Sequence, residues 1–322
     1  MKALITGGAG FIGSNFLRSI VFDNHPLPLS EIRVLDKLTY SGSKTNLKGI
    51  PSETFEFIEG DICDPQIVDS AISGVDIVFH FAAESHVDRS IESSRIFFET
   101  NVVGTQTLLQ ASLNKNVARF IHVSTDEVYG SIQEGSWVEE FPLSPNSPYS
   151  ASKASSDLVC LAYERTYGMN ISITRCSNNY GPNQFPEKVI PLFVTNLIEG
   201  KKVPLYGGGG NIRDWLHVSD HCKGLMLVAE RGKSGEIYNI GGGEELENIQ
   251  LTRIILEAFG LGDDWIEYVP DRRGHDYRYS VDISKAQREL GYKPSIGFKD
   301  GIQQTVSWYR ENRDWWEPLK RK

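Results

Sequence analysis

Short hydrophobic runs recur through the first half of the chain, separated by polar or glycine-containing turns. Runs of this length are typical of strands buried in a parallel sheet. The predicted strands are residues 3–6, 32–36, 55–59, 75–81, 120–124 and 171–175. Helical spacing follows Gly13 as far as about Phe22 and is found again at residues 97–113 and 149–167. This alternation predicts an α/β fold, a doubly wound parallel sheet with helices on both faces.

The pattern loosens after Pro182, where turns rich in glycine separate short strands and helices. We therefore expect residues 1–182 to form the main α/β domain and residues 183–322 to form mainly a smaller substrate-binding lobe. Some segments of this lobe are expected to return to the sheet. No linker separates two independent domains.

Composition and charge narrow the classes of partner. The 322 residues carry a formal net charge of -9, so no basic field is available to gather nucleic-acid phosphates. No apolar run is long enough to cross a membrane. The 4 cysteines lack metal or redox spacing, which predicts no metal site and reduced thiols in the cytoplasm.

The first chemical motif is a glycine loop between the first strand and the first helix. Gly7, Gly10 and Gly13 permit a tight turn and close approach of a pyrophosphate to the helix N-terminus, as in a Rossmann fold. Asp36 ends the next strand, where its carboxylate would accept hydrogen bonds from both ribose hydroxyls and repel a 2′-phosphate. This favours NAD as the cofactor, although the neighbouring Lys37 slightly weakens the preference.

The second motif is Tyr149 with Lys153, one helical turn apart. An isolated pair of this kind would usually be an ordinary helix start with an exposed lysine. In this chain the cofactor-binding fold and Ser124 at the end of the preceding strand both favour a catalytic role for the Tyr149–Lys153 pair. The ammonium and the nicotinamide ring are expected to lower the pKa of the phenol. Tyr149 could then accept a proton from a substrate alcohol.

The third motif is Asp126–Glu127, directly after a predicted strand. The alternative interpretation is a solvated acidic turn. Adjacent side chains of a strand point to opposite faces, so both carboxylates can serve one substrate only if the backbone leaves strand geometry immediately after Ser124. Two carboxylates in one cleft can divide acid and base work. From the residues alone, this indicates an NAD enzyme with additional acid and base groups.

These motifs resemble those of the extended short-chain dehydrogenase/reductase family, also described as NAD-dependent epimerases and dehydratases. Within it, the similarity is to nucleotide-sugar 4,6-dehydratases and covers the chain to about Trp316. The segments that carry it are residues 7–13, 82–89, 124–130, 149–153, 175–182, 213–217 and 271–279. The most specific is Thr125-Asp126-Glu127, because related epimerases and decarboxylases generally lack this triplet.

The resemblance implies a reaction and a set of residues for it. Tyr149, aided by Thr125, would take the proton of the sugar 4-hydroxyl while NAD takes hydride from C4. Glu127 would then remove the C5 proton, and Asp126 would protonate the departing C6 hydroxyl. Hydride return to C6 gives a 4-keto-6-deoxy sugar, with dTDP-glucose as the expected substrate.

The implied binding residues fall into two groups. The expected cofactor contacts are Gly7, Gly10, Phe11, Ile12, Gly13, Asp36, Lys37, Leu38, Thr39, Asp61, Ile62, Phe81, Ala82, Ala83, Ser85, Thr100, Ser124, Tyr149, Lys153 and Asn178. The expected substrate contacts are Ser85, Thr125, Asn179, Lys188, Val189, Pro204, Tyr206, Arg213, Asn248, Arg273 and His275.

Two alternatives remain open from the sequence. A nucleotide-sugar 4-epimerase would use NAD and Tyr149 but would not need Asp126 and Glu127. A non-catalytic NAD-sensing protein could share the fold. By analogy with the family, a homodimer that pairs through the helices at residues 97–113 and 149–167 is expected.

Overall fold

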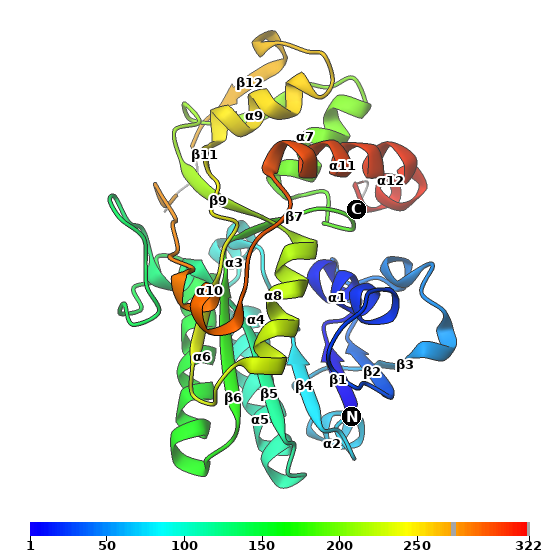
Figure 1. Ribbon diagram of the computed structural model, residues 1–322. Coiled ribbons are helices and arrows are strands. Elements are labelled where there is room, and N and C mark those ends of the chain that lie inside the picture. Colours follow the sequence, from blue (N-terminus) through cyan, green and yellow to red (C-terminus); the bar gives the residue numbers. More distant parts are fainter. Residues whose placement is uncertain (272–274, 321–322) are drawn as a thin grey trace.

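The computed structural model describes residues 1–271 and 275–320 (Figure 1). Its centre is a parallel sheet of seven strands in the order β10-β6-β5-β4-β1-β2-β3. The strands are β1 (Lys2–Thr6), β2 (Glu31–Asp36), β3 (Glu56–Glu59), β4 (Ile77–His80), β5 (Arg119–Thr125), β6 (Ile171–Cys176) and β10 (Ile237–Ile240). The predicted α/β fold is confirmed, and the strand order reverses between β1 and β4, which places the ligand crevice at their carboxyl ends.

Helices cover both faces of this sheet and bury its hydrophobic side chains (Figure 1). On one face, α1 (Phe11–Phe22) packs beside α8 (Val218–Arg231), where Phe16 and Leu225 share a core with Ile121 of β5. On the other face, α5 (Thr105–Asn114) lies between α2 (Pro65–Ala71) and α6 (Pro148–Tyr167). Burial on both faces explains why the strands are almost continuously apolar.

The helix predicted at residues 97–113 is not one regular helix. It consists of α4 (Arg95–Phe98), a π-helical turn η3 (Glu99–Gly104) and α5, and α3 (Val87–Glu92) precedes it. The wider π turn changes the direction of its side chains, and such turns are frequent at functional sites. Asn101 in this turn receives a hydrogen bond from the Glu84 backbone N–H at 2.8 Å. The interruption therefore connects this helix to the loop that follows β4.

The second half of the chain builds a separate hydrophobic core above the strand ends (Figure 1). Its elements are β7 (Asn178–Tyr180), α7 (Val189–Ile198), β8 (Val203–Tyr206), β9 (Ile212–His217), β11 (Glu245–Glu247), α9 (Asn248–Glu257), β12 (Ile266–Val269), α11 (Phe298–Glu311) and α12 (Arg313–Lys320). Helix α10 (Ser284–Leu290) also comes from this half, but it packs against α8 and β10 as part of the core of the main sheet. The 3₁₀ turns among the described residues are η1 (Lys44–Leu47), η2 (Ser52–Thr54), η4 (Asp126–Tyr129) and η5 (Asp263–Trp265). Sheets of three strands (β11-β9-β7) and two strands (β12-β8) support this part.

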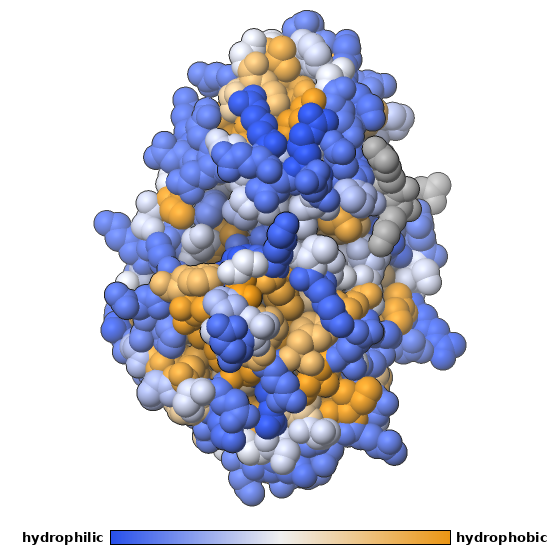
Figure 2. All heavy atoms as spheres, turned by 90° about the vertical axis from the view of Figure 1, so that its right-hand side faces the viewer, coloured by the Kyte–Doolittle hydropathy of each residue, from blue (hydrophilic) through white to orange (hydrophobic). Residues whose placement is uncertain are grey.

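The second half is not confined to this upper part. Strand β10 pairs with β6 at the edge of the main sheet, and α8 packs against its face. The division at residue 182 therefore remains a prediction about function rather than a clean structural boundary. On the face shown in Figure 2, hydrophilic residues dominate the upper part, whereas hydrophobic areas interrupt them in the lower part. Within the described residues, no helix combines the length and apolar character needed to cross a bilayer.

Candidate active site

A pocket opens where the strands of the main sheet end, and a second pocket lies beside it against the upper part. Residues from the ends of β1, β2, β4, β5 and β6 line the first pocket, together with the start of α6. The two pockets share Glu127, Asn178, Asn179, Gln184, Glu187 and Lys188. They are therefore neighbouring parts of one cleft, with the shared residues at their junction.

The glycine loop forms one end of the first pocket, between β1 and α1. A Cβ at Gly13 would lie 2.3 Å from the Gly7 carbonyl oxygen, and a Cβ at Gly7 would lie 2.6 Å from the Ala82 nitrogen. At Gly10 the corresponding Cβ would meet only the Gly7 oxygen, at 3.2 Å. Two glycines thus allow tight packing of the loop, whereas Gly10 leaves space on the pocket side. This cradle at a helix N-terminus fits a pyrophosphate.

Asp36 is buried at the end of β2, where backbone N–H groups hold its carboxylate. Ala9 donates to Oδ2 at 2.9 Å and Leu38 donates to Oδ1 at 2.8 Å. Each oxygen keeps further acceptor capacity toward the pocket, which fits ribose hydroxyls. Lys37 forms an ion pair with Asp61 at 2.5 Å, so an acidic partner already balances its charge. This pairing makes the Lys37 ammonium less available to a 2′-phosphate.

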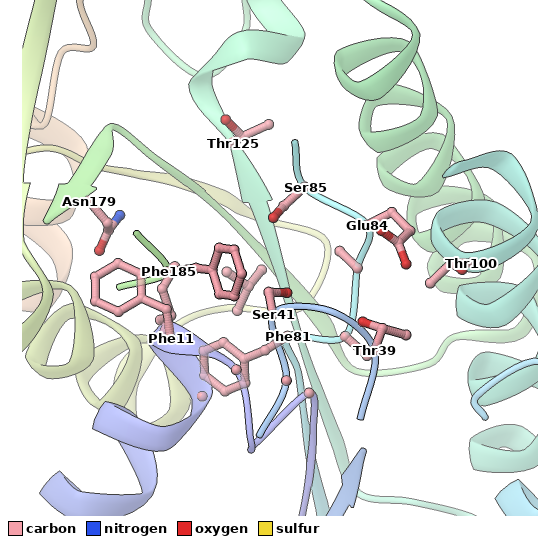
Figure 3. A pocket seen from close by; sticks show the side chains of 18 of the residues that line it. Phe11, Thr39, Ser41, Phe81, Glu84, Ser85, Thr100, Thr125, Asn179 and Phe185 are labelled. Carbon is pink, nitrogen blue, oxygen red and sulfur yellow. The ribbon is translucent and has the colours of Figure 1, made fainter. Parts of the chain in front are cut away.

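Nearly all the other predicted cofactor residues line the first pocket. They are Phe11, Ile12, Thr39, Ile62, Phe81, Ala82, Ala83, Ser85, Thr100, Ser124, Tyr149, Lys153 and Asn178. Figure 3 shows Phe11, Phe81 and Phe185 gathered on one side of this pocket, with Thr39, Glu84 and Thr100 on the other. The apolar side suits a ring, and the polar side suits hydroxyl groups.

Leu38 is the exception among the predicted cofactor contacts, because it does not line the pocket. Its backbone adopts a positive φ of 56°, and its side chain packs against the hydrophobic core. Leu38 contributes through its N–H group, which fixes the carboxylate of Asp36. A sequence motif places such a residue near the ligand, but it does not show that the side chain turns away.

Asp126 and Glu127 both line the pocket on turn η4, directly after β5. The strand continues through Thr125, one residue further than predicted, and the 3₁₀ turn then brings the two side chains to the same cleft. Thr125 Oγ1 caps this turn, accepting from the Glu127 N–H at 3.3 Å. The change in backbone geometry that a shared acid–base site requires is therefore present.

The two carboxyl groups have different environments. Asp126 is 1% exposed and Glu127 is only partly buried. Asp126 Oδ1 accepts a hydrogen bond from Thr125 at 3.2 Å, whereas Oδ2 has no partner in the described protein. Burial, followed by the negative charges of Glu127 and Asp214, raises the pKa of Asp126 well above its ordinary value. This shift favours the neutral acid, which is a proton donor.

Tyr149 and Lys153 occupy the first turns of α6, which begins with Pro148 and a Ser147–Ser150 capping box. Both side chains are buried and line the pocket. The predicted lowering of the phenol pKa depends on the nicotinamide ring, and for the protein alone the shift has the opposite direction. Burial, then Glu127, raises the pKa of Tyr149 well above its ordinary value, whereas a hydrogen bond with Thr125 lowers it. Lys153 instead donates to the Val123 carbonyl oxygen at 2.8 Å.

The predicted substrate residues divide between the two pockets. Ser85 and Thr125 line the first pocket, Asn179 and Lys188 line both, and Val189, Pro204, Tyr206, Arg213, Asn248 and His275 line the second. Arg273 lies outside the described residues. The guanidinium of Arg213 lies 4.2 Å from the centre of the Tyr279 ring and donates to the Asp276 carbonyl at 2.8 Å. The second pocket therefore has a cation fixed in its wall.

Several lining residues were not predicted from the sequence. Tyr40 and Phe185 approach edge to face, with ring centres 5.6 Å apart, and Arg89 lies 3.9 Å from the centre of the Tyr40 ring. Arg89 also pairs with Glu187 at 3.0 Å. These contacts join helix α3 to two loops that are far apart in the sequence. Glu84, Ser177 and Tyr279 lie inside segments that carry the family resemblance, and this signal could have placed them in the cleft. Tyr40 and Phe185 lie outside those segments.

The parallel sheet, the glycine cradle and the Tyr149–Lys153 pair at the strand ends define the class of protein. They are the features of a short-chain dehydrogenase/reductase type of enzyme with a nucleotide-binding crevice. Comparison with known proteins narrows this class.

A family model described as GDP-mannose 4,6 dehydratase matches residues 4–305, and the chain belongs to this family. A dTDP-glucose 4,6-dehydratase from Actinoplanes sp. is 57% identical over 98% of this chain and 100% of its own length. The crystal structure of a dTDP-glucose 4,6-dehydratase from Streptomyces venezuelae with NAD bound has a TM-score of 0.98. It is 57% identical and covers 99% of this chain and 100% of its own.

Structural similarity extends to an enzyme with another activity. The UDP-glucose 4-epimerase of Thermus thermophilus, solved as a complex with NAD, has a TM-score of 0.89. It is 31% identical and covers 97% of this chain and 100% of its own. The fold alone therefore does not choose between dehydration and epimerisation, and the side chains of the site must do so.

Proposed function

We propose that this protein is an NAD-dependent hydro-lyase that converts dTDP-glucose to dTDP-4-keto-6-deoxyglucose. The observation that carries the proposal is the pair Asp126 and Glu127 in the same cleft as Tyr149. Asp126 is buried with a raised pKa, and Glu127 is partly buried. An epimerase does not need this pair. The full-length similarity to dTDP-glucose 4,6-dehydratases supports the choice of substrate.

The residues present fit NAD. Gly10 leaves space beside a helix N-terminus, Asp36 offers acceptor atoms to ribose hydroxyls, and Asp61 balances the charge of Lys37. When bound, NAD would supply a hydride acceptor, later the hydride donor, and the positive charge of its oxidised ring. The proton transfers at the sugar oxygens and at C5 are carried out by side chains of the protein.

Tyr149 is the group that takes the proton of the sugar 4-hydroxyl. In the protein alone its phenol stays protonated, because burial and Glu127 raise its pKa. Loss of its proton becomes favourable when positive charge is brought close to it, and Lys153 supplies a buried ammonium on the next turn of α6. Thr125, which is buried at the end of β5, assists by hydrogen bonding. Tyr149 therefore takes the 4-hydroxyl proton only when the cofactor and the sugar are both bound.

Elimination uses the two carboxyl groups in sequence. Oxidation at C4 makes the adjacent C5 proton acidic enough for a carboxylate to remove, and Glu127 takes it. Asp126 gives its proton to the C6 hydroxyl, which leaves as water. A neutral, buried Asp126 is suited to donate, because solvent does not compete for its proton. Reduction at C6 and return of a proton to C5 complete the product without net consumption of cofactor.

The second pocket is the proposed site of the nucleotide diphosphate. Arg213 and Lys188 place cations on its wall and at the junction of the two pockets. Lys188 donates to the Ser85 carbonyl at 3.0 Å, so its ammonium is held near the sugar position. Guanidinium and ammonium groups bind phosphate oxygens by charge-assisted hydrogen bonds. Tyr206, Asn248 and His275 then surround the nucleoside.

The test is incubation of the purified protein with dTDP-glucose and, separately, with UDP-, GDP- and CDP-sugars. We expect 4-ketosugar absorbance with dTDP-glucose and no change in the total cofactor. Accumulation of a 4-epimer instead would show that the alternative epimerase is correct. If no nucleotide sugar is turned over while NAD is retained, the chain is a non-catalytic NAD-binding protein.

We also propose that the protein is a cytoplasmic homodimer. Large apolar side chains are exposed on the adjoining helices α3 to α6: Ile91, Ile96, Phe98, Val103, Leu158 and Tyr167. A neighbouring patch of this kind favours contact with another protein surface.

The four cysteines, all within the described residues, form no disulfide, which supports the cytoplasm as the compartment.

A further inference from the structure

Three side chains follow one another along a single face of α6: Tyr149, Lys153 and Asp157. Residues four positions apart on a helix are neighbours on its surface. Tyr149 and Lys153 line the pocket, whereas Asp157 lies one turn deeper and is 0% exposed. The mechanism described above gives Asp157 no task, although an aspartate is rarely buried to this degree without partners.

Lys153 needs a source of negative charge. Its ammonium is 4% exposed and donates to the neutral carbonyl of Val123 at 2.8 Å. Burial lowers the pKa of Lys153, and Asp157 is the leading group that opposes this effect. A lysine buried in this way loses its proton readily unless a negative charge is near.

Asp157 is itself held ionised by a fixed cation. Its Oδ2 accepts a hydrogen bond from Arg175 Nε at 2.9 Å, and its Oδ1 lies 3.4 Å from His122 Nε2. Burial alone would raise the pKa of Asp157, but Arg175 and His122 outweigh burial and hold it below the ordinary value. Arg175 is 2% exposed and lies over the ring of Tyr129, 4.7 Å from its centre. The carboxylate therefore has one orientation.

The other titratable groups around this face are mostly uncharged at neutral pH. Burial lowers the pKa of His122 to about 4 and that of His80 well below its ordinary value. Burial also raises the pKa of Cys176 to about 12 and that of Cys160 well above its ordinary value. The groups that face Lys153 or Asp157 are Tyr149 and Cys160 on α6, His80 on β4, His122 on β5, Arg175 and Cys176 on β6, Tyr129 on η4, and Glu139 beyond it. Among the described groups acting on Lys153, Asp157 is the ionised one.

We propose that Asp157, fixed by Arg175, is a positioning residue that keeps Lys153 protonated beneath Tyr149. Asp157 does not touch the substrate in this assignment, and it acts through the lysine. The proposal rests on the proposed function, in which Lys153 must carry a charge for Tyr149 to lose its proton. It extends the Tyr149–Lys153 pair to a line of three groups along α6.

The experiment compares Asp157→Asn with the wild type in two ways. Titration of the Lys153 ammonium, followed by NMR in protein with isotope-labelled lysine and assigned with Lys153→Met, needs neither substrate nor turnover. We expect its pKa to fall by about one unit, the size of shift that a nearby buried charge typically causes. The rate of C4 oxidation in a single turnover should lose its alkaline limb at a correspondingly lower pH.

Three further variants separate positioning from folding. Asp157→Glu keeps the charge and should keep the lysine titration near the wild-type pH even if the fold is weakened. Asp220→Asn removes an equally buried carboxylate that accepts from Ser295 and Ile296, and it should destabilise the protein without moving the titration. Because Asp157→Asn leaves Arg175 unpaired, Asp157→Asn with Arg175→Gln provides a version without an isolated buried charge. This double variant should lower the pKa of Lys153, as Asp157→Asn does.

An unchanged Lys153 titration in both Asp157→Asn and the double variant would overturn the proposal. The same would follow if Asp220→Asn shifted the lysine equally, because the effect would then reflect general loosening. A wild-type protein that turns over no nucleotide sugar would instead refute the proposed function, while the titration would still decide the role of Asp157.

Discussion

At the scale of the residue, Asp126 shows how a group suited to catalysis lowers stability. Its Oδ2 has no partner within the described protein, and its carboxyl group is buried. Burial of an unsatisfied polar group costs folding free energy. An isosteric amide at this position cannot ionise, so replacement by asparagine isolates the electrostatic part of that cost.

We predict that Asp126→Asn is more stable than the wild type at neutral pH. The folded pKa of Asp126 is raised, so the folded protein keeps a proton that the unfolded chain has lost. Wild-type stability therefore falls as pH rises above about 4, by up to about 1.4 kcal/mol for each pH unit until the folded pKa is reached. Urea unfolding at several pH values should show that the free energy of unfolding of Asp126→Asn exceeds that of the wild type, and that this difference disappears below about pH 4. If the variant were more stable by the same amount in acid, the ionisation of Asp126 would not be the cause of the difference.

A second prediction at this scale separates the tasks of the two carboxyl groups. Glu127→Gln should still oxidise C4 but accumulate bound reduced cofactor, with little exchange of the C5 hydrogen for solvent deuterium. Asp126→Asn should be slow because the hydroxyl leaves without a proton, a loss of roughly 10²–10⁴-fold. Both variants are measured in a single turnover with dTDP-glucose.

Replacement of the 6-hydroxyl by fluoride supplies the control, because fluoride departs without protonation. The defect of Asp126→Asn should then shrink, whereas that of Glu127→Gln should persist. Equal rescue of both variants, or of neither, would mean that the roles are assigned wrongly.

The residues of the site were largely predictable from sequence, but their ionisation was not. Most of the site consists of motifs formed by residues close together in the sequence, which can be recognised without a structure. These are the glycine loop, the Asp126–Glu127 pair and the Tyr149–Lys153 pair, with Asp36 at the end of the next strand. The raised pKa of Tyr149 depends on burial and on Glu127, which comes from a different element. The same holds for Tyr40 and Phe185, whose contact joins loops separated by most of the first half.

At the scale of the element, the glycine loop offers a matched pair of substitutions. Gly13→Ala would place a Cβ 2.3 Å from the Gly7 oxygen, which forces α1 away from the loop. Gly10→Ala would meet the same oxygen at 3.2 Å and would otherwise point into space that the cofactor needs. We expect Gly13→Ala to lose roughly 1–3 kcal/mol of folding stability, the usual cost of overpacking. Gly10→Ala should fold nearly normally and bind NAD more weakly.

Thermal unfolding without added NAD, together with the NAD content of the purified variants, tests this pair. If Gly10→Ala proved the less stable of the two, the loop would be packed differently from the arrangement described. If Gly10→Ala bound NAD as the wild type does, the pyrophosphate would not approach the loop at this position.

Elements were predicted well where hydrophobic runs were short and their ends carried turn residues. All six predicted strands are present, with ends that differ by a few residues at most. The helix at residues 97–113 failed as a regular helix, because its π turn depends on tertiary hydrogen bonds from Asn101 to the loop at Glu84 and to Ser152 on α6. A periodic pattern carries no sign of such contacts.

At the scale of the whole molecule, the exposed apolar face of α3 to α6 predicts a dimer. Val103 is 51% exposed and Leu158 is 58% exposed, on elements that pack side by side. Changing both to lysine should convert a dimer to a monomer without unfolding it, since neither side chain belongs to the core. Analytical ultracentrifugation measures the mass, and circular dichroism checks the fold. The matched control is Phe22→Lys, an equally exposed residue on α1, which should leave the dimer intact.

The arrangement of the second half was the least predictable feature at this scale. Strand β10 has to be paired with β6, and the small sheets combine β7, β9 and β11 from well-separated segments. Sequence patterns identify that a strand exists but not its distant partner. The loosened pattern after Pro182 indicated a change of architecture, and only the structure shows which segments rejoin the main sheet.

The late arrival of β10 has a consequence for the protein while it is still being made. Strand β6 is wholly buried, yet one of its edges is covered only by β10, whose residues leave the ribosome after those of α7, β8, β9 and α8. During this interval a nascent chain with six of the seven strands of the main sheet complete presents an unpaired, apolar edge of β6, a template for pairing with other chains. Release of incomplete chains should therefore yield aggregates, and molecular chaperones have a defined strand to shield until synthesis passes Ile240.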